Sequence, residues 1–126
     1  MTKLLRRYMI DYKKPTAQML GRWQPFHKGH FELFKKILEK TGQVCIMVRD
    51  QEITESNPYS FEQIKENIEK ALIDYKGKYD IIKVPNITNI CYGRGVGYKI
   101  EEIVLSEEIQ NISATKIRKG EIKNEF

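Results

Sequence analysis

Histidine and cysteine are both scarce in this chain, which has two of each among its 126 residues. The cysteines, Cys45 and Cys91, lie far apart and match no metal-binding spacing. Cys45 lies inside an apolar run, as expected of a buried thiol in a reducing compartment. No apolar run is long enough to span a bilayer, and the charges scattered through residues 1–20 are not typical of a secretory signal. These absences predict a cytoplasmic protein that does not enter a membrane.

The sequence also lacks a concentrated block of charge. Lysine and arginine number 22 against 17 aspartates and glutamates, which gives a formal net charge of +5. A basic surface suits nucleic acid, an anionic membrane or a small phosphorylated ligand. Because the lysines are spread along the chain, we interpret most of them as a solvated surface. The length favours a single domain over residues 1–126.

Apolar patterning predicts that strands and helices alternate along the chain. Short apolar runs are separated by stretches in which apolar residues recur at helical spacing. Ser60 and Gln63 form a capping box, which predicts the start of the second helix. The predicted strands cover 16–20, 43–48, 79–84 and 99–105, and the predicted helices cover 30–40, 61–72 and 111–120.

This order of elements predicts an α/β fold. We expect a Rossmann-like three-layer sandwich, with a mostly parallel sheet of roughly four to five strands and helices on both faces. Residues 1–15 precede the first strand and could form an edge strand, an oligomer arm or a mobile tail. Residues 120–126 follow the last predicted helix as a tail.

Both histidines lie in one stretch, "GRWQPFHKGH", at residues 21–30. The stretch begins where the first strand ends and runs into the first helix, at the sheet edge where open α/β folds bind ligands. Helix N-termini attract anions, and His27 and His30 are spaced to face the same ligand. Gly29 removes a side chain where a phosphate would approach the backbone. A surface pair, a capping pair or half of a metal site would also fit, although no third histidine exists to complete a metal site.

The "HKGH" sequence, preceded by "GRWQPF", resembles the HxGH motif of the nucleotidylyltransferase superfamily. The second motif of that superfamily, ISxTxxR, matches "ISATKIR" at residues 112–118. The first motif is most similar to that of the archaeal-type nicotinamide-mononucleotide adenylyltransferases, and "NPYSFEQ" at 57–63 resembles the segment that opens their second helix. The resemblance spans residues 17–119, with a segment from 85 to 112 that is shorter than in those enzymes.

The resemblance implies that an acceptor's phosphate attacks the α-phosphorus of a nucleoside triphosphate and releases pyrophosphate. ATP is the favoured donor and CTP the alternative, and Mg²⁺ would be held by the triphosphate rather than by a carboxylate cage. The catalytic residues would be His27, Lys28, His30 and Arg118. The nucleotide would be bound by Gly21, Arg22, Trp23, Gln24, Pro25, Phe26, Gly29, Ser113, Ala114 and Thr115. Base stacking by Trp23, Phe26 or Tyr92 is weighed against core packing, which is the commoner role of such rings.

The acceptor is expected to be a small molecule that carries a phosphate or phosphonate. Arg49 follows the second strand and could bind an acidic group, and Asn86 and Arg94 follow the third strand. The glycine-spaced stretch around Arg94 could form a loop over the site or a simple turn. A non-catalytic nucleotide-binding regulator is a second hypothesis. A nucleic-acid binder is disfavoured, because both motifs would then be coincidences. Members of the superfamily are often homo-oligomers, but no interface can be identified in the sequence.

Overall fold

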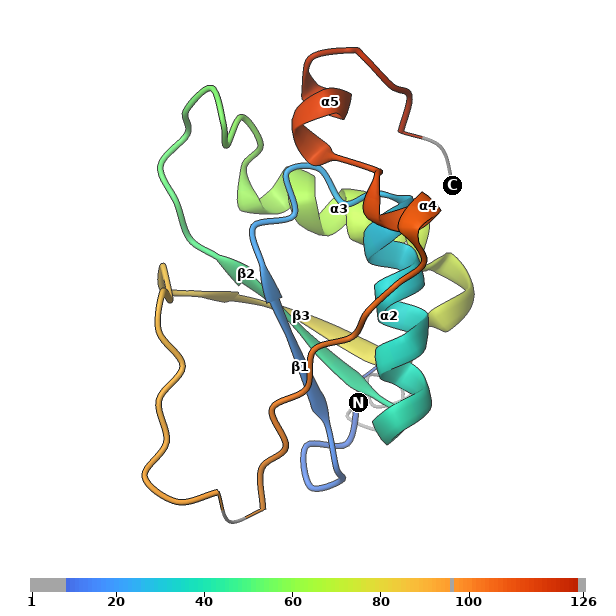
Figure 1. Ribbon diagram of the computed structural model, residues 1–126. Helices are drawn as coiled ribbons and strands as arrows, with labels where there is room; N and C mark the ends of the chain where they lie inside the picture. Colours follow the sequence, from blue (N-terminus) through green and yellow to red (C-terminus); the bar gives the residue numbers. More distant parts are fainter. Residues whose placement is uncertain (1–8, 96, 125–126) are drawn as a thin grey trace, which may run out of the picture.

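A computed structural model describes residues 9–95 and 97–124, so the outermost parts of both predicted terminal segments lie outside the described residues. Three parallel strands form one sheet in the order β1 (Ala17–Gly21), β2 (Val44–Arg49) and β3 (Tyr79–Val84) (Figure 1). The first three predicted strands are therefore confirmed, as are the α/β class and the parallel pairing. Within the described residues the sheet has three strands rather than four or five.

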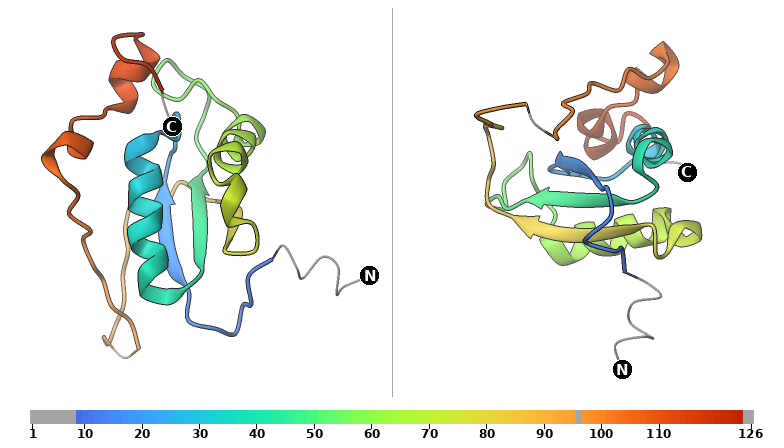
Figure 2. Two further views of the ribbon diagram at one scale, coloured as in Figure 1. Left: turned by 90° about the vertical axis from the view of Figure 1, so that its right-hand side faces the viewer. Right: turned by 90° about the horizontal axis from the view of Figure 1, so that it is seen from below.

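The two long helices are α2 (Lys28–Thr41) and α3 (Phe61–Ala71), and a short 3₁₀ turn, η1 (Ile73–Tyr75), follows α3. Both helices pack on the same face of the sheet rather than on opposite faces (Figures 1 and 2). The reason is geometric, because two right-handed crossovers that step in the same direction along a sheet leave their helices on one side. Within the described residues, no helix has both the length and the apolar character that a membrane span requires.

One hydrophobic core lies between the sheet and these two helices. Alternate strand residues point into it, as the period of two in a strand requires. Met19, Ile46, Phe34 and Ile68 are each at most 2 % exposed. Burying such side chains stabilises the fold by about 1.5–3 kcal/mol each. The core thus fixes the three strand ends from which the loops of the candidate site depart.

The predicted strand at 99–105 is wrong: this segment pairs with no strand. It crosses over α2 as an extended connection, held by an ion pair of 3.3 Å between Lys40 and Glu101. Ile103 packs against the core, whereas Ile100 and Val104 stay 64 % and 73 % exposed. Because so little of this segment is buried, strand pairing here would gain little stabilisation from the burial of apolar side chains. The chain then forms two short helices, α4 (Glu107–Gln110) and α5 (Ala114–Arg118).

Local signals in the sequence explain where the long helices begin and end. The Ser60 hydroxyl accepts a hydrogen bond from the backbone N–H of Gln63, and the Gln63 side-chain oxygen accepts one from the backbone N–H of Ser60. The predicted capping box is therefore confirmed. Helix α2 ends at Gly42, which has a φ of 78° and donates its N–H to the Leu38 carbonyl. A left-handed residue at this position is the usual glycine-based helix stop.

We expect the substitution Gly42→Ala to lower the free energy of unfolding by about 1 kcal/mol, because a Cβ is strained at this φ. Chemical denaturation with the far-ultraviolet circular dichroism signal measures the change. Gly93→Ala is the matched control, since Gly93 has no positive φ and no atom within 4 Å of the added Cβ. Equal stabilities for the two variants would contradict this account of the helix stop.

Candidate active site

The loop from β1 to α2 is held rigidly at the carboxyl end of the sheet. Trp23 has a positive φ of 56° and is 6 % exposed, and its indole N–H donates to the Met47 carbonyl at 3.0 Å. A Cβ on Gly21 would lie 2.7 Å from this indole, so glycine is needed where the ring folds back over the strand end. Gln24 donates to the Tyr59 carbonyl and accepts from the Tyr59 amide, both at 3.0 Å. The Gln24–Pro25 peptide bond is cis.

The two histidines form the N-terminal cap of α2. His27 is the N-cap residue, and its Nδ1 accepts a hydrogen bond from the Gly29 amide at 3.0 Å. His30 returns the interaction, because its Nδ1 accepts from the His27 amide at 3.1 Å. The rings are stacked, with centroids 3.6 Å apart, and the ring of His30 meets the Trp23 indole edge-on at 4.7 Å. This is a capping box made of imidazoles, so the capping alternative is part of the geometry.

These contacts decide which nitrogen of each histidine is available to a ligand. A neutral imidazole has one N–H donor and one acceptor nitrogen. Because both Nδ1 atoms accept backbone N–H groups, the ring proton belongs on Nε2 in both residues. Each histidine therefore has an Nε2–H that can donate to an anionic oxygen. This pair can supply two neutral donors side by side without bringing charge into the loop.

Burial keeps both rings neutral. It lowers the pKa of His27 to about 4. It also lowers the pKa of His30 to about 3, with a smaller contribution from the charge that His27 would carry. A protonated ring would lose its Nδ1 acceptor and with it the cap. The helix start and the neutral state of the histidines are thus mutually dependent.

Gly29 serves the histidine cap directly. A Cβ at this position would lie 2.8 Å from Cε1 of His27 and 3.1 Å from its Nδ1, and 3.6 Å from the Ile109 carbonyl oxygen. The ring of His27 thus occupies the space that we expected a phosphate to use. The need for glycine here is the close approach of the imidazole to the backbone of the first helical turn.

The second motif forms the short helix α5. Ser113 is its N-cap residue, and the Ser113 hydroxyl accepts from the Lys116 amide at 3.3 Å. The Arg118 guanidinium donates to Oγ1 of Thr115 at 3.3 Å and also to the backbone carbonyl of Gln24. The predicted helix at 111–120 is confirmed in its core, although it covers only Ala114–Arg118.

Helix α5 and the histidine loop therefore meet at one end of the molecule, above the start of α2 (Figure 1). A second link follows α5, where the Asn124 side chain donates to the Phe26 carbonyl at 3.2 Å. A cleft of about 400 Å³ opens between Lys28 and the segment 112–124. His30 and Ile112 are 82 positions apart in the sequence (112 − 30). In the structure, the two motifs nevertheless lie in the same part of the molecule.

Polar side chains continue this neighbourhood along the carboxyl ends of the strands. Arg22 is exposed, and its guanidinium lies 3.5 Å from Oδ1 of Asn57. Arg49 ends β2 and donates to Oδ1 of Asn86 at 2.9 Å, and the Gln51 amide donates to the same oxygen at 3.0 Å. Nε of Arg49 and Oε1 of Gln51 are buried without a hydrogen-bond partner. A buried polar atom without a partner needs an explanation, and a site for a polar ligand is one such explanation.

Two of the predicted aromatic residues lie in the core, and one predicted arginine lies away from the histidine loop. Phe26 is fully buried and Trp23 nearly so, so both rings belong to the core and leave no face open for stacking on a base. Arg94 is exposed and lies in the connection after β3, which runs to the end of the molecule remote from the start of α2 (Figure 1). The ion pair between Lys40, near the C-terminal end of α2, and Glu101 agrees with that path. Arg94 is therefore not brought to the candidate site.

Several residues of this neighbourhood were missed by the sequence analysis. Asn57 opens the recognised segment 57–63 but was not assigned a role, and Gln51 and Asn124 have no local pattern that distinguishes them from other surface amides. Gln51 could have been suspected from its position two residues after Arg49 at a strand end. Asn124 follows the second motif and gave no signal at all.

The fold and the histidine motif agree with the comparison to known protein families. The family model described as cytidylyltransferase-like matches residues 19–88, which is more than half of the chain. The chain belongs to this cytidylyltransferase-like family. The match begins inside β1 and ends just after β3, so it includes the histidine cap and Arg49 but not α5.

Curated relatives of the chain come from archaea. It is 38 % identical over 73 residues to a nicotinamide-nucleotide adenylyltransferase of Methanococcus vannielii, a match that covers 56 % of this chain and 42 % of that protein. It is 36 % identical over 54 residues to the protein of the same name from Thermoplasma acidophilum, covering 41 % of this chain and 30 % of the relative. The match thus spans less than half the length of these relatives.

A metal ion would find few ligands here. Among the described residues no cluster of three or more His, Cys, Asp or Glu side chains could hold one. Nδ1 of each histidine is already engaged by a backbone amide.

We expect the free energy of unfolding to fall as the pH is lowered from about 6.5 towards 4. In this range His27 and His30 become protonated in the unfolded chain but stay neutral in the folded one. The full stabilising effect is present above the ordinary histidine pKa and is lost as the pH falls towards the folded value. Thermal unfolding across this range measures it. The double variant His27→Ser/His30→Gln keeps a capping box without titrating groups, and its profile should be flatter. Parallel profiles would contradict the assignment.

Proposed function

We propose that this chain is a nucleotidylyltransferase that transfers AMP from ATP to a small acceptor bearing a phosphate or phosphonate. The observation that carries this proposal is the meeting of the two motifs through the hydrogen bond from Arg118 to the Gln24 carbonyl. It brings neutral imidazole donors, a guanidinium and the Ser113–Thr115 hydroxyls to one end of the sheet. The adenylyltransferase names of the archaeal relatives support the adenylyl donor.

The chemistry needs no catalytic base. An ionised phosphate oxygen of the acceptor forms a bond to the α-phosphorus, while the bond from that phosphorus to the bridging oxygen breaks and pyrophosphate leaves. Negative charge develops on the α-phosphoryl oxygens and on the leaving group. Catalysis can therefore consist of positioning and charge stabilisation. Mg²⁺ bound to the triphosphate would neutralise part of that charge.

The two histidines are the donors that we assign to the transferred phosphoryl group. Their Nε2–H groups are held side by side by the cap, so no reorganisation is needed when charge develops. Lys28 is exposed on the first turn of α2 and can reach the outer phosphates as a long cationic arm. The Arg118 guanidinium already donates hydrogen bonds to the Gln24 carbonyl and to Oγ1 of Thr115. It would therefore act from a fixed position on the β- or γ-phosphate.

The acceptor is assigned to the neighbouring ends of β2 and β3. Arg49 with Asn86 and Gln51 forms a cluster with an unpaired N–H donor, and a guanidinium is suited to a phosphate or carboxylate. This group belongs to the part of the chain that the family model covers. The match covers less than half the length of the relatives, so their acceptor is not carried over to this chain.

CTP remains the alternative donor, since the matching family is described as cytidylyltransferase-like. A nucleotide-binding regulator without turnover is the alternative from another class. Both alternatives use the histidine cap. A cytidylyltransferase would release pyrophosphate from CTP, whereas a regulator would release none. A single assay of the full chain with ATP, CTP, GTP and UTP against a panel of phosphorylated metabolites separates them.

In that assay we expect His27→Ser to lower pyrophosphate release by roughly 10²–10³-fold, as for other deleted donors to a developing anion. Serine retains an N-cap oxygen, so the helix start is preserved while the imidazole is lost. Lys36→Ala, at an exposed position of the same helix, is the matched control. Retention of near-full turnover by His27→Ser would exclude the proposed role. Nucleotide binding by the unchanged chain without any pyrophosphate release would favour the regulator.

Arg49→Ala should raise the KM for the acceptor by roughly 10-fold or more, because a hydrogen bond to a charged group is lost. The KM for the nucleotide should change little. Arg94→Ala is the control, because Arg94 lies away from the start of α2 (Figure 1). Steady-state kinetics with each substrate varied in turn measure the difference. A larger effect from Arg94→Ala would place the acceptor elsewhere.

A further inference from the structure

The outer edge of β3 is open. In the part of the chain that the structure describes, no segment pairs with it, since β3 is the last strand of the sheet. The Lys78 carbonyl accepts from the Val44 amide at 2.9 Å, and the Val84 carbonyl accepts from the Asp50 amide at 2.8 Å. The even-numbered residues of this stretch therefore turn their backbone groups towards β2. Tyr79, Ile81 and Lys83 present their N–H and C=O groups to the open edge.

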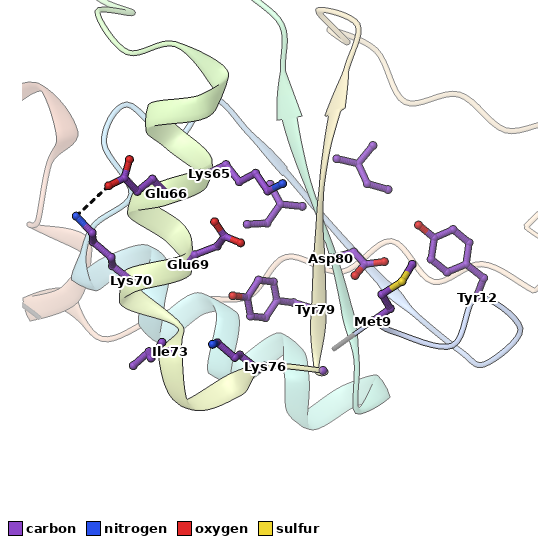
Figure 3. A pocket seen from close by; sticks show the side chains of 13 residues that line it. Met9, Tyr12, Lys65, Glu66, Glu69, Lys70, Ile73, Lys76, Tyr79 and Asp80 are labelled. Atoms are coloured by element: carbon purple, nitrogen blue, oxygen red, sulfur yellow. Dashed lines mark ion pairs between the residues drawn. The ribbon is translucent and has the colours of Figure 1, made fainter. Parts of the chain in front are cut away.

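A groove of about 690 Å³ runs along this edge. Helix α3 forms one wall, and Met9 and Tyr12 lie on the other side of the strand (Figure 3). Tyr79 points towards the helix wall and Asp80 towards Tyr12 (Figure 3). The groove thus has β3, the last strand of the described sheet, as its floor. Long unprotected edges of this kind are sites at which another strand can add.

The charges around the groove balance. Its lining includes three lysines and three carboxylates, namely Lys65, Lys70, Lys76, Glu66, Glu69 and Asp80. The chain as a whole has a net charge of +5, so two copies repel each other over most orientations. They do not repel through a neutral surface in which both signs alternate. Such a surface is complementary to itself, whereas a strongly acidic or basic partner would gain nothing from it.

We propose that the β3 edge is the interface of a homodimer, in which β3 of one copy pairs antiparallel with β3 of the other. A two-fold axis at Ile81 sets Ile81 opposite its own copy and Tyr79 opposite Lys83 of the second copy. In this register all three outward N–H groups of each strand find a carbonyl, and the two sheets become one continuous sheet. The copies of α3 then run antiparallel beside each other, which brings the Glu66–Lys70 ion pair of 3.2 Å within one helix near the same pair in the other.

The groove lies at the opposite edge of the sheet from β1 and the histidine loop. This interface is therefore independent of the proposed catalytic function, and either can fail without the other. None of the groove residues belongs to either motif or to the cluster of Arg49, Gln51 and Asn86.

The substitution Lys83→Pro tests the pairing. Lys83 is exposed, and its N–H points outward, so proline removes a donor to the second copy without removing one to β2. Lys83→Ala keeps the N–H and is the matched control. Sedimentation velocity of the full chain, over a wide range of concentrations, compares the monomer of 14.9 kDa with a species of twice that mass. We expect the unchanged chain and Lys83→Ala to dimerise, and Lys83→Pro to raise the dissociation constant roughly 10-fold or more.

A second variant keeps the test decisive if Lys83→Pro does not fold, which circular dichroism will report. Ile73 is 55 % exposed in η1, the turn after α3 that also lines the groove, and Ile73→Asp should weaken the dimer to a similar extent. Its control is Ile53→Asp, at a position 62 % exposed in the loop after β2. A chain that stays monomeric at every concentration overturns the proposal. So does a dimer that neither Lys83→Pro nor Ile73→Asp weakens beyond its control.

Discussion

The hydrogen bond from the Gly29 amide to Nδ1 of His27 joins the fold of this protein to its chemistry. It satisfies a free N–H at the start of α2, as any N-cap must. It also fixes the ring proton on the opposite nitrogen, where a ligand can use it. The reciprocal bond from the His27 amide to His30 does the same for the second ring. Removing either imidazole therefore affects a helix terminus and a pair of donors together.

The residues around this cap keep both histidines neutral and hold their rings in place. Trp23 packs its indole edge against His30, and its own N–H is anchored on β2. Gln24 ties the same loop to the backbone before α3. Burial then holds the pKa of both histidines far below the usual value, so their donors are present throughout the neutral pH range. Residues that looked like ligand contacts thus act largely as the frame that positions the two imidazoles.

The arginines illustrate how far a local pattern can guide site prediction. Arg49 comes directly at the end of a buried strand, so its position on the rim follows from the sheet itself, and the structure links it to Asn86 and Gln51. Arg94 lies in a long connection without regular structure, and nothing local determines where such a segment travels. The path of the connection is set by the packing of Ile103 against the core and by the ion pair between Glu101 and Lys40. These are long-range contacts that a pattern of glycines does not encode.

The sequence by itself determined the three strands, the two long helices and their caps, because apolar periodicity and capping residues act over a few positions. It also determined the two motifs and hence the family. Only the tertiary structure decided that α2 and α3 share one face and that 99–105 does not join the sheet. It alone showed that the ring of His27 fills the space above Gly29, and that Arg118 reaches the Gln24 carbonyl. These outcomes depend on burial and hydrogen bonding between residues distant in the chain, where several local conformations have similar energy and only packing selects one.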